Sequence, residues 1–91
     1  MLTVYKYAIP VEDSFSLPMP IGARVLCVQV QRGEPCIWAM INTGADLVRR
    51  QFALRGTGHN CDGLGSSRTY VGTFQLGEGS FVGHLFDLGV P

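Results

Sequence analysis

Short apolar runs separated by turn residues constrain the fold of this chain more than any other feature. The runs are about five to eight residues long, and no helical apolar period is sustained for more than about two turns. Segments of that length suit strands, whereas a helix in a small protein needs a longer periodic stretch. We therefore predict an all-β, mainly antiparallel protein: a small sandwich or a partly open barrel of about six to seven strands.

The length of the chain, 91 residues, predicts a single β-rich domain over residues 1–91. A chain of this size buries only roughly 60 to 65% of the surface that its unfolded form exposes, so its core is thin. Yet 46% of the residues are hydrophobic and only 15% are charged. Apolar surface is therefore left over, and we expect a homo-oligomer to cover it.

The formal charge is zero, with seven basic and seven acidic residues. Binding long nucleic acid needs a net basic face, so we exclude it, although a small phosphate ligand needs only about two or three arginines. We find no apolar run long enough to span a membrane and no signal peptide, and we expect a cytoplasmic protein. The three cysteines, an odd number, are expected to be free thiols.

The expected strands can be assigned to particular segments of the sequence. Residues 2–9 read as a strand, and "PMPIG" (residues 18–22) reads as a loop or an edge strand because proline cannot donate to a central ladder. Residues 23–31 form the clearest strand, with Leu26, Val28 and Val30 predicted on one face. "RGEP" then turns the chain into residues 36–42, a hairpin partner predicted to be buried on both faces.

Residues 47–55 alternate between apolar and polar side chains. Val48, Phe52 and Leu54 are predicted to face the core, and Arg49, Gln51 and Arg55 to face outward, so the outer face of this strand is basic. The last two strands, "TYVGTFQL" and "SFVGHLFDL", flank a three-residue turn, Gly77 to Gly79. That turn predicts the pairs Leu76 with Ser80, Phe74 with Val82, Gly72 with His84 and Tyr70 with Phe86. His84 would then be a partly buried core histidine lying under a glycine.

The segment "AMINTGADLV" (residues 39–48) resembles the active-site turn of retroviral-type aspartic proteases. The position of the catalytic aspartate is Asn42, and an amide cannot take up or release the proton that a carboxylate pair shares. The chain is therefore not expected to cleave peptides, and a degenerate protease fold is kept as a remote alternative. We interpret Thr43, Gly44 and Asp46 as turn residues.

The glycine-rich segment "GTGHNCDGLGSS" (residues 56–67) fails the known loop templates. A P-loop requires a lysine where Leu64 stands, and a dinucleotide fingerprint requires a glycine at Cys61. A zinc site from His59, Cys61 and Asp62, with His84 as a further candidate ligand, is a weaker alternative, because a closed site needs four ligands, commonly in paired short spacings. A Cys61 nucleophile with a histidine base is another, because nothing in the sequence identifies an orienting group or an oxyanion hole.

Two arginines flank this segment, and backbone N–H groups in glycine-rich turns can surround an anion while guanidinium groups bind phosphate. Trp38, Tyr70 or His59 could supply a stacking surface for a base. The alternative is a mobile hairpin loop without a ligand. The predicted ligand-binding residues are Arg55, Gly56, Gly58, His59, Arg68 and Tyr70.

Five segments are distributed over most of the chain: "YKY" (5–7), "GARVLCVQVQRGEPCIWA" (22–39), "FALRGTGH" (52–59), "YVGTFQL" (70–76) and "FVGHLF" (81–86). Through these segments the chain resembles a family of short bacteriophage and prophage proteins of unassigned function. The resemblance implies a phage product acting in the bacterial cytoplasm, and it assigns no catalytic residue.

These observations favour a non-enzymatic, oligomeric β-domain that binds a small anionic, nucleotide-like molecule. In a phage setting, such a protein would sequester a nucleotide signal of host defence. We expect no cofactor, no metal ion and no catalytic residue. The alternative is a protein–protein interaction or structural module of a phage, docking through a sheet edge or an apolar patch.

Overall fold

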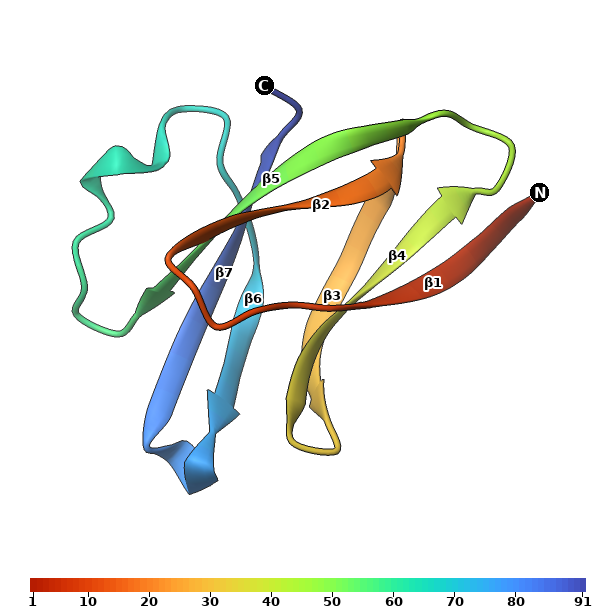
Figure 1. The fold of residues 1–91 in the computed structure, drawn as a ribbon. Coiled ribbons are helices and arrows are strands. Elements are labelled where there is room, and N and C mark those ends of the chain that lie inside the picture. The colour runs from red at the N-terminus through yellow and green to blue at the C-terminus, as the bar shows by residue number, and fades with distance from the viewer.

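The computed structural model describes residues 1–91 and contains seven strands in two antiparallel sheets. The three-stranded sheet has the order β1-β4-β3, and the four-stranded sheet has the order β2-β5-β7-β6 (Figure 1). The bounds are β1 Leu2–Ala8, β2 Ser14–Pro20, β3 Arg24–Gln31, β4 Glu34–Asn42, β5 Leu47–Gly56, β6 Thr69–Leu76 and β7 Phe81–Gly89. The predicted all-β fold is confirmed as an open sandwich.

Two 3-10 turns, Asp62–Leu64 and Gly77–Gly79, are the only helical elements. Each has three residues, and neither has the length or the apolar character that a membrane-crossing helix needs. All three cysteines are free thiols, and Cys61 is the exposed one.

The β3–β4 hairpin forms as the sequence predicts. Gln31 pairs with Glu34, so the loop consists of Arg32 and Gly33, which both have positive φ angles, 52° and 80°. Two residues in that conformation match the right-handed twist of the strands that they join. In β4 the inner residues Ile37 and Ala39 are fully buried, but Met40 on the other face is 37% exposed, so only part of that face is covered.

A β-bulge changes the predicted faces of β3. Val25 pairs with Ala39 and Cys27 with Trp38, which leaves Leu26 as an extra residue. The alternation shifts by one at this point, so Val28 is buried while Leu26 is 43% exposed. The prediction that Leu26 shares the core face with Val28 and Val30 was wrong for this reason.

The core lies between the two sheets. It is a cluster of 11 buried residues, and the completely inaccessible ones are Met19, Ile37, Ala39, Phe52 and Leu85. Met19 comes from β2, which ends in "PMP" and lies at the edge of the four-stranded sheet, as its two prolines predict.

A salt bridge between Arg50 of β5 and Asp87 of β7 links two strands of the four-stranded sheet. The Arg50 side chain donates to both Asp87 oxygens, Nε to Oδ1 at 3.0 Å and Nη2 to Oδ2 at 2.7 Å, and its Nη1 donates to the Ala23 carbonyl at 2.8 Å. The Asp87 Oδ1 also accepts from the Gly89 N–H at 2.9 Å. Both side chains are largely buried, and their contacts join β5, β7 and the residue that precedes β3.

The β6–β7 register differs from the prediction. Leu76 pairs with Phe81, so the connection has four residues, Gly77 to Ser80, and Glu78 within it adopts φ 56°. His84 consequently lies opposite Thr73 and not opposite Gly72. A bulge at Val71 restores the predicted pairing of Tyr70 with Phe86.

Replacing Asp87 with asparagine should destabilise the fold strongly, because it leaves the buried Arg50 guanidinium without its counter-charge. We expect a loss of about 3 to 5 kcal/mol in the free energy of unfolding, measured by urea denaturation. Asp46→Asn, at an exposed turn position, is the matched control and should change little. A loss below about 1 kcal/mol for Asp87→Asn would show that the pair does not hold the sheets together.

Gly83 lies where a side chain cannot fit. A Cβ there would approach Phe74 Cζ to 2.8 Å and Phe81 Cε2 to 3.0 Å, whereas a Cβ on Gly63 would meet nothing within 4 Å. Gly83→Ala should therefore cost about 1 to 3 kcal/mol by overpacking. Gly63→Ala should be nearly neutral, and equal melting temperatures for the two variants would contradict this account.

Candidate functional site

The connection between β5 and β6, residues 57–68, is a crossover and not a hairpin loop. The strand β7 lies between β5 and β6 in the sheet, so the connection must pass from one side of β7 to the other. Figure 1 shows it on the side of the four-stranded sheet that faces away from the three-stranded sheet. We call this connection the crossover loop, and the side that it occupies the outer face. The expectation of a hairpin loop was wrong because the two flanking strands are not neighbours.

The crossover loop is held to the folded body at several points. Leu64 is only 5% exposed although it lies outside the main core cluster, and it is the single buried side chain of the loop. At the start of the loop, the His59 N–H donates to the Gly56 carbonyl at 3.0 Å, which closes a tight turn. Gly58 has φ 84° in that turn, a conformation that glycine adopts most easily. The loop is therefore a packed connection.

His59 folds back onto Gly56. Its Nδ1 accepts from the Gly56 N–H at 3.3 Å, and a Cβ on Gly56 would lie 2.8 Å from the His59 ring. Because Nδ1 accepts, the neutral ring carries its proton on Nε2. The glycine at position 56 thus makes room for the imidazole.

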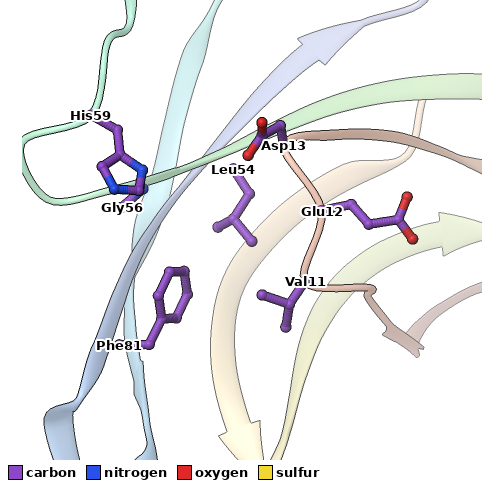
Figure 2. Close-up of a pocket in the computed structure, with 7 residues that line it drawn as sticks. All are labelled: Val11, Glu12, Asp13, Leu54, Gly56, His59 and Phe81. Atoms are coloured by element: carbon purple, nitrogen blue, oxygen red, sulfur yellow. The ribbon is translucent and has the colours of Figure 1, made fainter.

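A hollow of about 70 Å³ opens beside this contact. Figure 2 shows its lining: His59 lies over Gly56, and the Glu12 carboxylate points away from the other lining residues. Its remaining lining residues are Val11, Asp13, Leu54 and Phe81. Two acidic residues at its border make this hollow unfavourable for an anion.

The Arg55 side chain points to the outer face, but two of its three guanidinium nitrogens already donate hydrogen bonds within the chain. Its Nη1 donates to the Asp13 carbonyl at 2.6 Å and to the Leu54 carbonyl at 3.0 Å, and its Nε donates to the Asn60 carbonyl at 3.1 Å. Its Nη2 makes no hydrogen bond within the chain. Arg55 therefore ties the crossover loop to the β1–β2 connection and keeps one donor nitrogen available.

Arg68 and Tyr70 lie at the other end of the crossover loop. Arg68 is exposed, and its Nη1 donates to the Gly65 carbonyl. Tyr70 is 51% exposed and packs edge-on against Phe86, with ring centroids 5.2 Å apart. The six predicted residues thus divide into two groups: Gly56 and His59 line the hollow, while the other four lie outside its lining, namely Arg55, Gly58, Arg68 and Tyr70.

His84 is the residue whose role the sequence reasoning missed. It lies on the outer face between Arg55 and Thr73, and its Nε2 is 2.7 Å from Thr57 Oγ1. Its Nδ1 lies 3.0 Å from the Tyr70 hydroxyl and 3.2 Å from Thr73 Oγ1, and the Tyr70 and Thr73 hydroxyls also bond to each other. The prediction of a core histidine was wrong, because the four-residue turn moves His84 to face hydroxyl groups.

The remaining candidate chemistries find little support in the geometry. No group of three His, Cys, Asp or Glu side chains is arranged to hold a metal ion. Asn42 serves the β4–β5 turn, where its Oδ1 accepts from the Gly44 N–H at 3.0 Å and from the N-terminal ammonium group at 3.3 Å. The residues after Asn42 thus form the turn in which the sequence predicts Thr43 and Gly44.

A comparison with family models assigns the chain. The model described as "Domain of unknown function (DUF7352)" matches residues 1–90, so the chain belongs to this family. No curated protein and no solved structure matches it.

Truncating Leu64 should release the crossover loop while leaving the sheets intact. We expect Leu64→Ala to speed amide hydrogen exchange in residues 57–68, because the loop loses its only buried side chain. Leu47→Ala, at a position that is 67% exposed, is the control. Unchanged exchange in the loop would show that Leu64 does not anchor it.

Proposed function

We propose that this member of the DUF7352 family is a non-enzymatic binding protein that holds a small anionic, nucleotide-like ligand on the outer face of its four-stranded sheet. The observation that carries the proposal is the distribution of charge. The four strands of this sheet contain a single side-chain carboxylate, that of Asp87, and it is paired with Arg50. The side chains that face outward, Arg49, Arg55 and His84, therefore have no unpaired acidic side chain beside them on these strands.

Several donors on this face remain available for an anion. Arg49 is exposed and makes no hydrogen bond within the chain, and Arg55 and Arg68 each use only part of their guanidinium groups. Planar guanidinium groups bind phosphate through paired hydrogen bonds. The one acidic residue of the crossover loop, Asp62, is exposed and makes no ion pair. The balance of charge on this face favours an anionic ligand.

An aromatic surface lies beside these cations. The Tyr70 ring is half exposed, and His84 is held next to it by hydrogen bonds to Tyr70 and Thr57. Flat exposed rings can stack on a nucleobase, which favours a nucleotide over a simple inorganic anion. The proposal invokes binding alone: His84 serves it through its hydrogen bonds with the hydroxyl groups of Thr57 and Tyr70, which fix the position of the ring.

The biological setting of this proposal comes from the resemblance to phage and prophage proteins. In that setting the ligand would be a nucleotide signal of host defence, sequestered in the bacterial cytoplasm. Sequestration requires tight binding and no turnover, which a small rigid β-domain can provide.

A second candidate function, protein docking, is favoured by a different surface. The outward side of the three-stranded sheet carries Leu2, Val4 and Met40, which are 71%, 46% and 37% exposed. Contiguous apolar side chains of this kind are typical of protein interaction sites.

Isothermal titration calorimetry with AMP tests the ligand proposal, with adenosine as the uncharged comparison. We expect AMP to bind more tightly than adenosine, because only AMP carries the phosphate. Arg49→Gln and Arg68→Gln should each weaken AMP binding about tenfold or more, as expected when a hydrogen bond to a charged group is lost.

The control variant is Arg24→Gln, an exposed arginine on the three-stranded sheet, which should bind AMP as the wild type does. Equal affinities for AMP and adenosine, or equal losses in all three variants, would contradict an anion site on the outer face. Circular dichroism establishes that each variant remains folded.

A further inference from the structure

The four edge strands of the two sheets differ in how they are protected. The edge of β2 carries Pro18 and Pro20, which cannot donate to a further strand. The edges of β3 and β6 each contain a bulge and approach each other so closely that a Cβ on Gly72 would lie 3.1 Å from Val28. The remaining edge, β1, has no proline, no bulge and no covering element.

The side chains of β1 also leave this edge open. Leu2, Val4 and Tyr5 are 71%, 46% and 48% exposed. Lys6 is the only charged residue of the strand, and its Nζ donates to Gln31 Oε1 at 2.7 Å, on the strand β3 at the far side of the sheet. The charge that could repel a neighbouring strand is thus drawn away from the free edge.

The hydrogen-bond register shows which backbone groups are free. Beyond the two ends of β1, the Thr43 N–H donates to the Met1 carbonyl at 2.9 Å and the Ile9 N–H to the Pro35 carbonyl at 3.1 Å. In an antiparallel ladder such bonded positions alternate, so the odd-numbered residues of β1 face β4. The N–H and C=O groups of the even residues Leu2, Val4, Lys6 and Ala8 therefore point to the free edge.

We propose that β1 pairs with β1 of a second copy of this chain, antiparallel and centred on Tyr5, to form a continuous six-stranded sheet across a two-fold dimer. In this register Leu2 lies opposite the second copy's Ala8, and Val4 lies opposite its Lys6. Each of these pairs joins two even residues, whose free backbone groups face each other across the interface.

The register centred on Tyr5 is the one that uses the whole strand. It pairs all seven residues of Leu2–Ala8, whereas a register shifted toward Lys6 would place two lysines directly opposite each other. Four even residues in each of two copies supply about eight backbone hydrogen bonds, close to the number in a typical protein interface. Self-complementarity of this kind is what a two-fold interface requires.

Tyr5 supplies an independent argument for a second copy at this edge. It pairs with Ala39 and shares the inward side of β1 with Tyr7, yet it is 48% exposed. Burial raises the pKa of the Tyr7 hydroxyl, and the neighbouring Tyr5 raises it further. Two Tyr5 rings meeting at the two-fold axis would cover each other on the open side of the sandwich.

This dimer and the proposed ligand site use different sheets. The strand β1 belongs to the three-stranded sheet, and the proposed anion site lies on the outer face of the four-stranded sheet. Dimerisation therefore goes beyond the proposed function, and either proposal can fail without the other.

Light scattering coupled to size-exclusion chromatography tests the proposal on the whole chain over a range of concentrations. The wild type should approach twice the mass of the 9.9 kDa chain. Val4→Pro should be a monomer, because proline removes an N–H that points to the free edge while leaving the bonds to β4 intact. Val4→Ala keeps that N–H and should remain a dimer.

A charge exchange at the axis tests the register and does not depend on the proline variant folding. Tyr5→Glu alone and Tyr5→Lys alone should each be monomeric, because like charges then meet at the two-fold axis. An equimolar mixture of the two should recover the dimer. A wild-type mass of one chain at all concentrations would overturn the proposal and leave the edge to an extended segment of another protein. A mixture that stays monomeric would overturn the register.

Discussion

The buried contact between Arg50 and Asp87 determines how the rest of the structure is arranged. Taking a guanidinium and a carboxylate out of water is costly, and the cost is offset only when nearly every hydrogen-bonding position is filled. Here the carboxylate binds the guanidinium through both oxygens, and the Ala23 carbonyl takes a further donor. The pair fixes β5 against β7 and ties both to the residue that precedes β3. With Arg50 directed inward, the alternation of β5 directs Arg49 and Arg55 outward, so the same contact creates the basic outer face.

Apolar patterning was sufficient to predict the class of fold, the β3–β4 hairpin, the edge position of "PMP" and the outward direction of Arg49 and Arg55. This patterning gave the wrong side-chain faces where a bulge adds one residue to a strand, and the wrong register where the β6–β7 turn is one residue longer than expected. The bulges at Leu26 and Val71 lie in two strands that contact each other, β3 and β6, and no local residue pattern marks them. The four-residue turn depends on Glu78 in a left-handed conformation, which is uncommon outside glycine. The inward direction of Arg50 was missed because an arginine next to another arginine reads as part of a solvated face.

In the candidate site, too, the sequence shows which residues are present but not which residues they contact. Glycines and arginines of the crossover loop are visible in the sequence, but their partners are not. His59 is bound to Gly56, and Arg55 is bound to three carbonyl groups, so these two predicted ligand residues also hold the loop in place. His84 enters the site only through the true register of β6 and β7. The outer face therefore combines cations that the sequence shows with a hydroxyl-bound histidine that only the fold brings there.

Anion binding on the outer face of the four-stranded sheet can be measured by titrating the isotope-labelled protein with AMP. The NMR chemical shifts of backbone and arginine side-chain groups then report binding residue by residue. We expect saturable shifts at Arg49, Arg68, Tyr70 and His84, with no change at Trp38 on the other sheet. Saturable shifts confined to Trp38 and its neighbours, or no shifts at millimolar AMP, would contradict it.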